Sequence, residues 1–222
     1  MNNLISVIIP CHNGVNYLAE AIAGIKKQNI ETEIIVADDG STDNTARLAG
    51  THGCTVISIP HSGVSAARNA GLRKAGGGYV LFCDHDDILC EGALYRFLTE
   101  LQLDSSLQIV MAKARDFISP ELSDADKKIL SPRSNPYYGQ LSGAAFIAKD
   151  VFAITGGFNE SLATGETVDF ILRAESLGVK IKKIDFVAAG RRLHNTNRGR
   201  MAPKQEQKDY SRILRAKLRR GG

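Results

Sequence analysis

Residues 76–87 read Gly76-Gly77-Gly78-Tyr79-Val80-Leu81-Phe82-Cys83-Asp84-His85-Asp86-Asp87. The apolar run at 79–83 follows a glycine triplet, a pattern typical of a buried strand in a parallel sheet. The carboxylates that come directly after it raise the cost of ionising one another unless a cation joins them. Mg²⁺ and Mn²⁺ take carboxylate oxygens and complete their shell with water and substrate phosphates. The stretch therefore predicts a metal that holds a phosphorylated substrate at the end of a strand. The alternative is that the acidic residues cap a helix beginning near Glu91.

Strands and helices alternate before this stretch. Apolar, β-branched runs predict strands at residues 4–10, 33–37 and 54–59. Helical spacing predicts helices at residues 15–28, 42–49 and 62–75, the second of them capped by Ser41 or Thr42. With the strand at 79–83 this is the β-α-β-α-β-α-β pattern of an open sheet with helices on both faces. We expect an α/β fold with a Rossmann-like, mostly parallel sheet flanked by helices.

The alternation weakens after the acidic cluster. The pattern predicts helices at residues 91–103, 150–155 and 166–177, and strands at residues 107–114, 143–147, 180–184 and 186–193. Residues 119–140 contain Pro120, Pro132 and Pro136 among residues of mixed polarity, which indicates a surface loop or a short helix.

Length and composition describe an ordinary globular domain. The 222 residues are 43% hydrophobic and 23% charged, enough for one domain with a full core. The net charge of +4 is unevenly distributed, because residues 198–222 hold nine Lys or Arg and two acidic residues, leaving about −3 on the rest. Composition alone names no function.

The cysteines and the N-terminal residues indicate the compartment. Cys11, Cys54, Cys83 and Cys90 form no C-x-x-C pair, so free thiols in a reducing compartment are favoured over disulfides. The first residues lack the basic and apolar regions of a signal peptide, and no apolar run has the length of a membrane span. We expect a cytoplasmic protein, with peripheral contact to the inner face of the membrane left open.

Polar residues follow several of the predicted strands. Ligands of open α/β sheets bind outside the carboxyl ends of the strands, where this chain offers residues 10–13, Asp38-Asp39 and residues 84–87. Carboxylates after the second strand suit hydrogen bonds to a ribose hydroxyl or a pyrimidine N–H. The chain has neither a G-x-G-x-x-G after the first strand nor a P-loop motif, so a dinucleotide fold and a P-loop are not supported. Phosphates would then be neutralised by the metal.

Taken together, four segments resemble the family 2 glycosyltransferases, whose nucleotide-binding fold is called GT-A. They are Val7-Ile8-Ile9-Pro10-Cys11-His12-Asn13, Ala37-Asp38-Asp39-Gly40-Ser41-Thr42-Asp43, Gly63-Val64-Ser65-Ala66-Ala67-Arg68-Asn69-Ala70-Gly71 and Cys83-Asp84-His85-Asp86-Asp87. The resemblance extends from Ser6 to about Asn197. It implies a GT-A domain over residues 1–197, with a nucleotide-binding half at 1–103 and an acceptor-side half at 104–197. Residues 198–222 would form a basic tail.

The resemblance implies a nucleotide site in the first half. Pro10 and His12 would line the base pocket, and Asp39 would contact uracil or ribose with Asp38 beside it. The family usually has Tyr where this chain has His12, and an imidazole can still stack on a base. Arg68 and Asn69 would lie near the nucleotide, although Arg68 could instead belong to a solvated helix face. The full predicted nucleotide-binding set is Pro10, His12, Asn13, Asp38, Asp39, Arg68, Asn69, Asp84 and His85.

The resemblance also implies a metal site. Asp84 and Asp86 are similar to the family's D-x-D pair, with Asp86 as direct ligand, Asp84 reaching ribose or metal, and Asp87 supporting them. His194 matches a histidine that often completes the metal shell, although a lone histidine can also be structural. The cofactor would be Mn²⁺ or Mg²⁺, and an imidazole ligand slightly favours Mn²⁺.

Residues 165–173 are similar to the family's G-E-D segment at the start of a helix. Inverting transfer requires a base that takes the proton of the acceptor hydroxyl, and the family uses a carboxylate there. This chain has Thr167 in place of that Asp, and a threonine hydroxyl is not basic. We predict Glu166 as the base and keep Asp169 as the second candidate. Asp169 could instead be a helix-dipole partner or an ion-pair partner of Arg173.

Residues 205–220 predict a basic amphipathic helix. Such a helix can lie on an anionic membrane, or its apolar face can pack on the body of the protein, and the sequence favours neither. A nucleic-acid partner is disfavoured, because the positive charge is local and stacking aromatic residues are scarce.

The residues together predict a metal-dependent, inverting glycosyltransferase. It would move a sugar from a nucleotide diphosphate to a saccharide, lipid-linked or other hydroxyl acceptor. The favoured donor is a UDP-sugar. The alternative is a non-catalytic sugar-nucleotide-binding or scaffold protein of the same fold that has lost its base, as Thr167 suggests. A nucleotidyltransferase is disfavoured, because no Gly-rich, basic loop follows the first strand.

Overall fold

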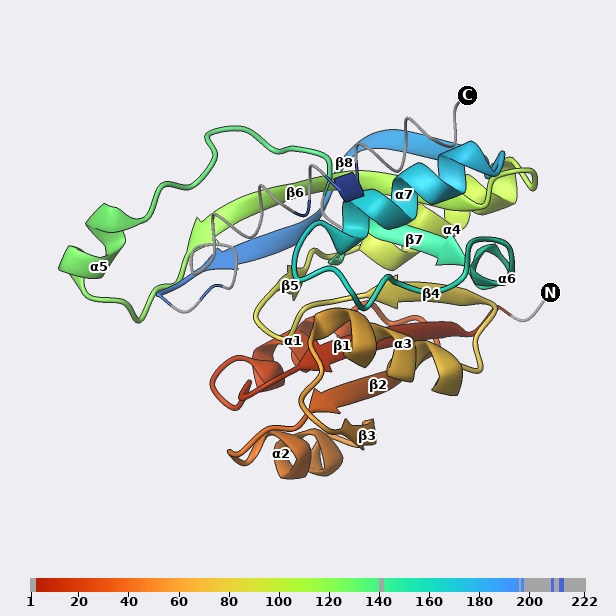
Figure 1. The fold of residues 1–222 in the computed structure, drawn as a ribbon. Helices are drawn as coiled ribbons and strands as arrows, with labels where there is room; N and C mark the ends of the chain where they lie inside the picture. The colour runs from red at the N-terminus through yellow and green to blue at the C-terminus, as the bar shows by residue number, and fades with distance from the viewer. Residues whose placement is uncertain (1–2, 140–141, 196, 198–208, 210–211, 214–222) are drawn as a thin grey trace.

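The computed structural model describes residues 3–139, 142–195, 197, 209, 212 and 213 (Figure 1). Within these residues, eight strands form one sheet in the order β3-β2-β1-β4-β7-β6-β8-β5. The strands are β1 (Ile5–Cys11), β2 (Thr32–Asp39), β3 (Thr55–Ile59), β4 (Tyr79–Phe82), β5 (Ile88–Leu89), β6 (Ile109–Ile118), β7 (Ala145–Ala148) and β8 (Ile181–Leu193). The helices are α1 (Leu18–Lys26), α2 (Thr45–Thr51), α3 (Val64–Lys74), α4 (Ala93–Leu103), α5 (Asp124–Ile129), α6 (Val151–Thr155) and α7 (Glu166–Ser176).

The first half of the sheet is parallel, as predicted. Strand β1 lies between β2 and β4 and is buried along its whole length, because helices cover both of its faces. Val7 and Ile9 share one core with residues of α1, α2 and α4, whereas Ile8 faces a second core with α6 and α7. Helix α3 packs so closely on that second side that a Cβ at Gly71 would lie 2.3 Å from Ile8 Cγ2. The result is a three-layer α/β arrangement.

The second half mixes directions. Strand β7 pairs antiparallel with both β4 and β6, while β6 runs parallel to β8. The two strands predicted at residues 180–184 and 186–193 are one strand, β8, so that prediction is wrong. The charged Asp185 between them does not interrupt the strand, because its side chain is 87% exposed and forms an ion pair with Lys113.

Several smaller predictions are adjusted by the structure. Strand β5 was not predicted, because a strand of two residues has no recognisable hydrophobic pattern. It pairs with the C-terminal part of β8. Helix α2 begins three residues later than predicted, after Asn44, and neither Ser41 nor Thr42 caps it. The predicted surface region at residues 119–140 does contain a short helix, α5, which stands away from the sheet (Figure 1).

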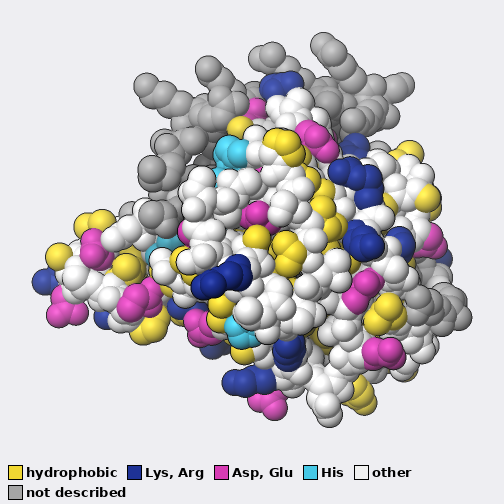
Figure 2. All heavy atoms as spheres, turned by 90° about the horizontal axis from the view of Figure 1, so that it is seen from below, with side chains coloured by type: hydrophobic (Ala, Val, Ile, Leu, Met, Phe, Trp, Pro, Cys, Tyr) yellow, Lys and Arg dark blue, Asp and Glu magenta, His cyan; other side chains and the backbone are white. Residues whose placement is uncertain are grey.

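Neither the surface nor the described residues of the tail indicate a cellular compartment. No helix in the described part of the chain is long and apolar enough to cross a membrane. Charged side chains of both signs are spread among hydrophobic and uncharged ones on the face seen from below (Figure 2). Most of the helix predicted at residues 205–220 lies outside the described residues; of the described ones, Asp209 and Ile213 are buried. All four cysteines are free thiols, as expected.

Candidate active site

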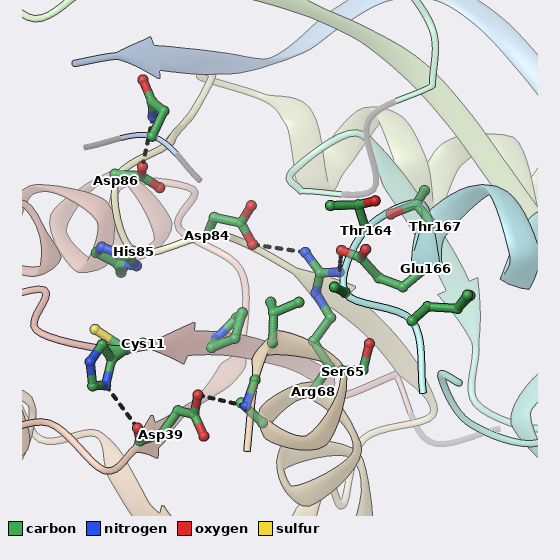
Figure 3. A pocket seen from close by; sticks show the side chains of 18 of the residues that line it. Cys11, Asp39, Ser65, Arg68, Asp84, His85, Asp86, Thr164, Glu166 and Thr167 are labelled. Atoms are coloured by element: carbon green, nitrogen blue, oxygen red, sulfur yellow. Dashed lines mark hydrogen bonds and ion pairs between the residues drawn. The ribbon is translucent and has the colours of Figure 1, made fainter. Parts of the chain in front are cut away.

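A cavity of about 1110 Å³ opens at the carboxyl ends of β1, β2 and β4 and reaches the start of α7 (Figure 3). Both halves of the chain contribute to its walls. The predicted residues that line it are Pro10, His12, Asn13, Asp39, Arg68, Asp84, His85, Asp86, Glu166 and His194. The fold thus brings most of the predicted nucleotide, metal and base residues to one cavity.

One end of the cavity is built around Asp39, the last residue of β2. Its carboxylate is buried and accepts hydrogen bonds from the backbone N–H groups of Ser62 and Gly63, at 2.6 and 2.9 Å. Its backbone carbonyl lies 2.8 Å from His12 Nδ1 and 3.0 Å from His61 Nδ1. Because a carbonyl oxygen can only accept, both histidines carry their proton on Nδ1 when neutral.

The two imidazole rings at this end lie against each other. The ring centroids of His12 and His61 are 4.2 Å apart, with the planes tilted by 35°. Asn13 lies beside them, donates from Nδ2 to His12 Nε2 at 3.2 Å, and accepts from the Thr42 N–H at 2.8 Å. His12, Asp39 and His61 also form a group of described residues whose potential metal-ligand atoms lie within 4.8 Å of one another. This end therefore offers the face of an aromatic ring beside a carboxylate.

The centre of the cavity is occupied by Arg68, on α3. Its Nη1 lies 2.8 Å from Glu166 Oε1 and its Nη2 lies 3.0 Å from Asp84 Oδ1, so one guanidinium joins the two halves (Figure 3). Burial opposes the charge, but the two carboxylates outweigh it and raise the pKa of Arg68. The solvated-face interpretation of Arg68 is wrong, because its side chain is only 4% exposed. Two buried atoms here, Ser65 Oγ and Arg68 Nε, have no hydrogen-bond partner among the described residues.

The predicted metal ligands Asp86 and His194 meet directly. Asp86 Oδ2 lies 2.9 Å from His194 Nε2 and accepts a further hydrogen bond from Asn197 Nδ2 at 3.3 Å. Burial tends to raise the pKa of Asp86, but the hydrogen bond to His194 and the charge of His85 bring it below its ordinary value. Two neighbouring ligands of an octahedral ion with bonds of about 2.1 Å are about 3.0 Å apart. The distance between Asp86 and His194 matches this value, and it is also the length of the hydrogen bond that joins the two side chains in this structure.

Asp87 lies behind this pair. Its carboxylate is buried and accepts a hydrogen bond from the Arg192 N–H at 3.1 Å. Burial, together with the charges of Asp86 and Asp84, raises the pKa of Asp87 well above its ordinary range. A bound cation would reduce this repulsion between the carboxylates of the acidic cluster. The donor set therefore fits a hard divalent ion.

Glu166 and Thr167 begin α7 at the opposite wall from the imidazole pair. Both line the cavity, and Gly165 before them has a φ of +74°, which glycine adopts without strain. Glu166 is buried and forms the ion pair with Arg68. A carboxylate that lines the cavity can accept a proton from a hydroxyl group.

Comparison with known proteins decides the family. The sequence model described as Glycosyl transferase family 2 matches residues 6–157, more than half of the chain. The chain belongs to glycosyltransferase family 2. Both the predicted family and the predicted GT-A fold are confirmed.

Relatives and solved structures agree with this assignment. The family 2 chain is 28% identical to the Escherichia coli chondroitin synthase over 99% of its own length and 33% of that protein. It is 30% identical to the Bacillus subtilis protein named uncharacterized glycosyltransferase EpsJ, over 82% of its length and 59% of that protein. The fold matches S. aureus TarS 1–349 in complex with UDP-GlcNAc with a TM-score of 0.77 at 22% identity, covering 97% of this chain and 66% of that one. The chain spans about a third of the length of the chondroitin synthase.

Three predicted residues of the family 2 site lie outside the cavity lining. Asp38 is buried near the end of β2, and its carboxylate accepts a hydrogen bond from the Ser41 N–H at 3.2 Å. Asn69 bonds the backbone of Phe158 at 2.8 and 2.9 Å. Asp169 forms a 2.8 Å ion pair with Arg173, as the structural interpretation of this residue expected.

Other cavity residues were missed by the sequence analysis. His61 could have been found, because it follows β3 and the carboxyl ends of parallel strands meet at one edge. Tyr17, which also lines the cavity, carried no comparable signal, whereas Arg192 lies outside the lining. Arg192 donates from Nε to the Asp86 carbonyl at 2.9 Å, and its guanidinium lies 4.9 Å from the Tyr17 ring and 4.7 Å from that of Phe117. These contacts hold the backbone of the acidic cluster.

Proposed function

We propose that this chain carries the catalytic domain of a metal-dependent, inverting glycosyltransferase. It transfers a sugar from a nucleotide diphosphate to a hydroxyl group of a saccharide, lipid-linked or other acceptor. The favoured donor is a UDP-sugar. One observation carries the proposal: a single cavity holds an aromatic and acidic end, the Asp86–His194 pair and the carboxylate of Glu166. Each of these features suits a different part of the same donor and acceptor pair.

The nucleotide would bind at the imidazole end. His12 offers a ring face for a base, and the Asp39 carboxylate offers acceptors for a pyrimidine N–H or a ribose hydroxyl. The fold match to a protein solved with UDP-GlcNAc supports a uridine nucleotide as the first donor to test. Of the other predicted residues, Asp38 and Asn69 would then act through the loops that they hold, because neither lines the cavity.

Asp86 and His194 would hold the metal, with Asp84 at the ribose or in the metal shell. A divalent ion there supplies charge stabilisation for the departing diphosphate, as negative charge builds on its oxygen. Arg192 and Asn197 fix these ligands through the Asp86 backbone and side chain. Mn²⁺ is the first ion to test because an imidazole is one of the ligands.

Glu166 would be the base. The acceptor oxygen attacks the anomeric carbon, its proton passes to the Glu166 carboxylate, and the bond from the anomeric carbon to the diphosphate breaks. Arg68 holds Glu166 at the wall of the cavity through the 2.8 Å ion pair. Asp169 is disfavoured for this role because Arg173 binds it outside the lining.

The test of turnover is nucleotide release. The purified chain is incubated with UDP-, GDP- and dTDP-sugars and Mn²⁺, with and without saccharide acceptors. We expect release from a UDP-sugar, and a fall in kcat of roughly 100-fold or more in Glu166→Gln. Glu175→Gln, which changes an exposed carboxylate of the same helix outside the cavity lining, is the matched control and keeps most of the activity. UDP-sugar binding without turnover, together with an inert Glu166→Gln change, would favour the non-catalytic alternative.

The test of the metal ligands is UDP binding. Asp86→Ala is expected to weaken UDP binding in Mn²⁺ by about 10- to 100-fold and to leave little difference between Mn²⁺ and EDTA. Isothermal titration calorimetry measures both affinities. Asp150→Ala, which changes an exposed carboxylate before α6, is the control. Unchanged Mn²⁺-dependent binding in Asp86→Ala contradicts the assignment of this residue.

A further inference from the structure

One wall of the cavity is a loop that leads into α7. We call residues 159–165 the α7 lead-in loop. Residues 160–165 all line the cavity, and the loop ends directly before Glu166. The position of the proposed base therefore depends on how this loop is held.

The α7 lead-in loop is fixed from one side by α3. Asn69 donates from Nδ2 to the Phe158 carbonyl at 2.9 Å and to Glu160 Oε1 at 2.8 Å, and its Oδ1 accepts from the Phe158 N–H. Gly157 has no room for a side chain, because a Cβ there would lie 2.4 Å from Asn69 Oδ1. These contacts fix the beginning of the loop against the nucleotide half.

Asp209 fixes the end of the loop from the opposite side. Its Oδ2 accepts hydrogen bonds from the backbone N–H groups of Ala163 and Thr164, each at 3.1 Å, and lies 3.4 Å from Thr164 Oγ1. Asp209 is completely buried, and the neighbouring Ile213 is 4% exposed. Arg212, one turn after Asp209, lies 3.7 Å from its carboxylate and donates to the Ser161 carbonyl. Asp209 and Arg212 therefore both contact the wall of the cavity.

The burial of Asp209 indicates that these hydrogen bonds matter. A carboxylate removed from water is costly unless hydrogen bonds or charges compensate it, and bonds from N–H groups to an ionised carboxylate are among the stronger ones. Asp209 does not line the cavity, so it has no direct role in binding a substrate. Its hydrogen bonds stabilise the conformation of the α7 lead-in loop.

We propose that Asp209 is a positioning residue for the acceptor side of the site. By holding the N–H groups of Ala163 and Thr164, it sets the path of the α7 lead-in loop and thereby the place of the Glu166 carboxylate. The catalytic part of this inference rests on the proposed function. Asp209 then supports the acceptor side of the site, while the nucleotide end, across the cavity, is independent of it.

The first readout is amide hydrogen exchange, which needs no activity. In Asp209→Ala we expect faster exchange at Ala163 and Thr164, with UDP affinity in Mn²⁺ unchanged. Asp209→Asn keeps an oxygen acceptor and is expected to retain most of the protection; it also serves as the test if Asp209→Ala does not fold. Asp185→Ala, which removes an exposed carboxylate on β8, is the matched control. Exchange at the wild-type rate in Asp209→Ala overturns the proposal.

The second readout separates the acceptor side from the donor side. We expect kcat for transfer to fall by up to about 100-fold in Asp209→Ala, because small displacements of a reacting group have effects of this size. Asp209→Asn should recover part of that loss. A parallel loss of UDP affinity and transfer would indicate a general folding defect and overturn the positioning role. Failure of the proposed function itself would appear in the wild-type chain, as absence of nucleotide release.

Discussion

At the scale of single residues, Arg68 is the group on which most of the site depends. Its guanidinium is buried and forms ion pairs with two carboxylates, those of Asp84 in the nucleotide half and Glu166 on α7. Removing one member of a buried charge group leaves the others uncompensated, which costs more than the group contributes when complete. The arrangement therefore ties the stability of the domain to the geometry of the site.

Arg68→Met is expected to destabilise the protein. The side chain keeps its approximate length but leaves Asp84 and Glu166 without their cation, which lowers the free energy of unfolding by about 3 kcal/mol. Because the Asp84 side chain is 34% exposed, the loss should lie at the lower end of the range for buried pairs. Urea denaturation followed by circular dichroism measures it. Arg47→Met, at an exposed position of α2, should change the unfolding free energy by less than about 0.5 kcal/mol. Equal stability of the two variants contradicts the prediction.

At the scale of elements, the end of β6 is tied to the start of α1. Glu121, just after β6, accepts hydrogen bonds from Ser119 Oγ at 2.6 Å and from Tyr17 OH at 2.7 Å. These hydrogen bonds, that of Ser119 first, lower the pKa of Glu121 to about 2. Tyr17 in turn lies 4.9 Å from the His194 ring. The contact therefore connects the region that carries α5 with the side of the cavity that holds Asp86 and His194.

Glu121→Gln is expected to destabilise the protein at neutral pH and not in acid. A carboxyl group whose folded pKa is lowered contributes stability above its unfolded pKa of about 4.3, and that stability is lost as the pH falls toward its folded pKa. The Tm of wild type should therefore exceed that of Glu121→Gln above about pH 5, and the two should converge toward pH 2. Differential scanning calorimetry over this range gives both curves. A constant difference in Tm across the range would show that the ionisation of Glu121 is not the cause.

The elements differ in how far the sequence could predict them. Strands β1 and β4 were predictable, because their apolar runs report burial on both faces. Strand β8 was split in the prediction at Asp185, since a sequence does not reveal that this side chain points to solvent. Strand β5 exists only because β8 is there to pair with it. Elements made by long-range pairing leave little local pattern.

The same limit applies to the site. The positions of Asp86, His194 and Glu166 in the cavity lining could be predicted because these residues lie in motifs at element ends. Asp209 could not, because its partners in the α7 lead-in loop lie 45 and 46 residues away along the chain. Asp169 had two interpretations in the sequence, and only the three-dimensional arrangement shows its ion pair with Arg173. Residues that act through packing become visible only in the folded chain.

At the scale of the whole molecule, the two halves of the chain share one sheet and one cavity. Leu81 of β4 pairs with Phe146 of β7, and Met111 of β6 pairs with Ala145 of the same strand. A core that includes Leu81, Phe97 and Phe146 continues across this boundary. The halves should therefore unfold together.

UDP with Mn²⁺ is expected to stabilise the whole domain in one step. A ligand that binds only the folded state adds about 2.7 kcal/mol to the free energy of unfolding when its concentration is 100 times its Kd. Calorimetry should show a single transition that shifts to higher temperature with UDP and Mn²⁺ and does not shift with UDP and EDTA. Two transitions, of which only one responds to UDP, would mean that the halves are separate folding units.

The position of β7 also limits how substrates enter and products leave. This strand is hydrogen-bonded to β4 on one side and to β6 on the other, so the two halves cannot swing apart about a hinge without breaking its ladders. Any motion that accompanies substrate binding or product release must therefore leave the β4–β7 and β6–β7 ladders intact.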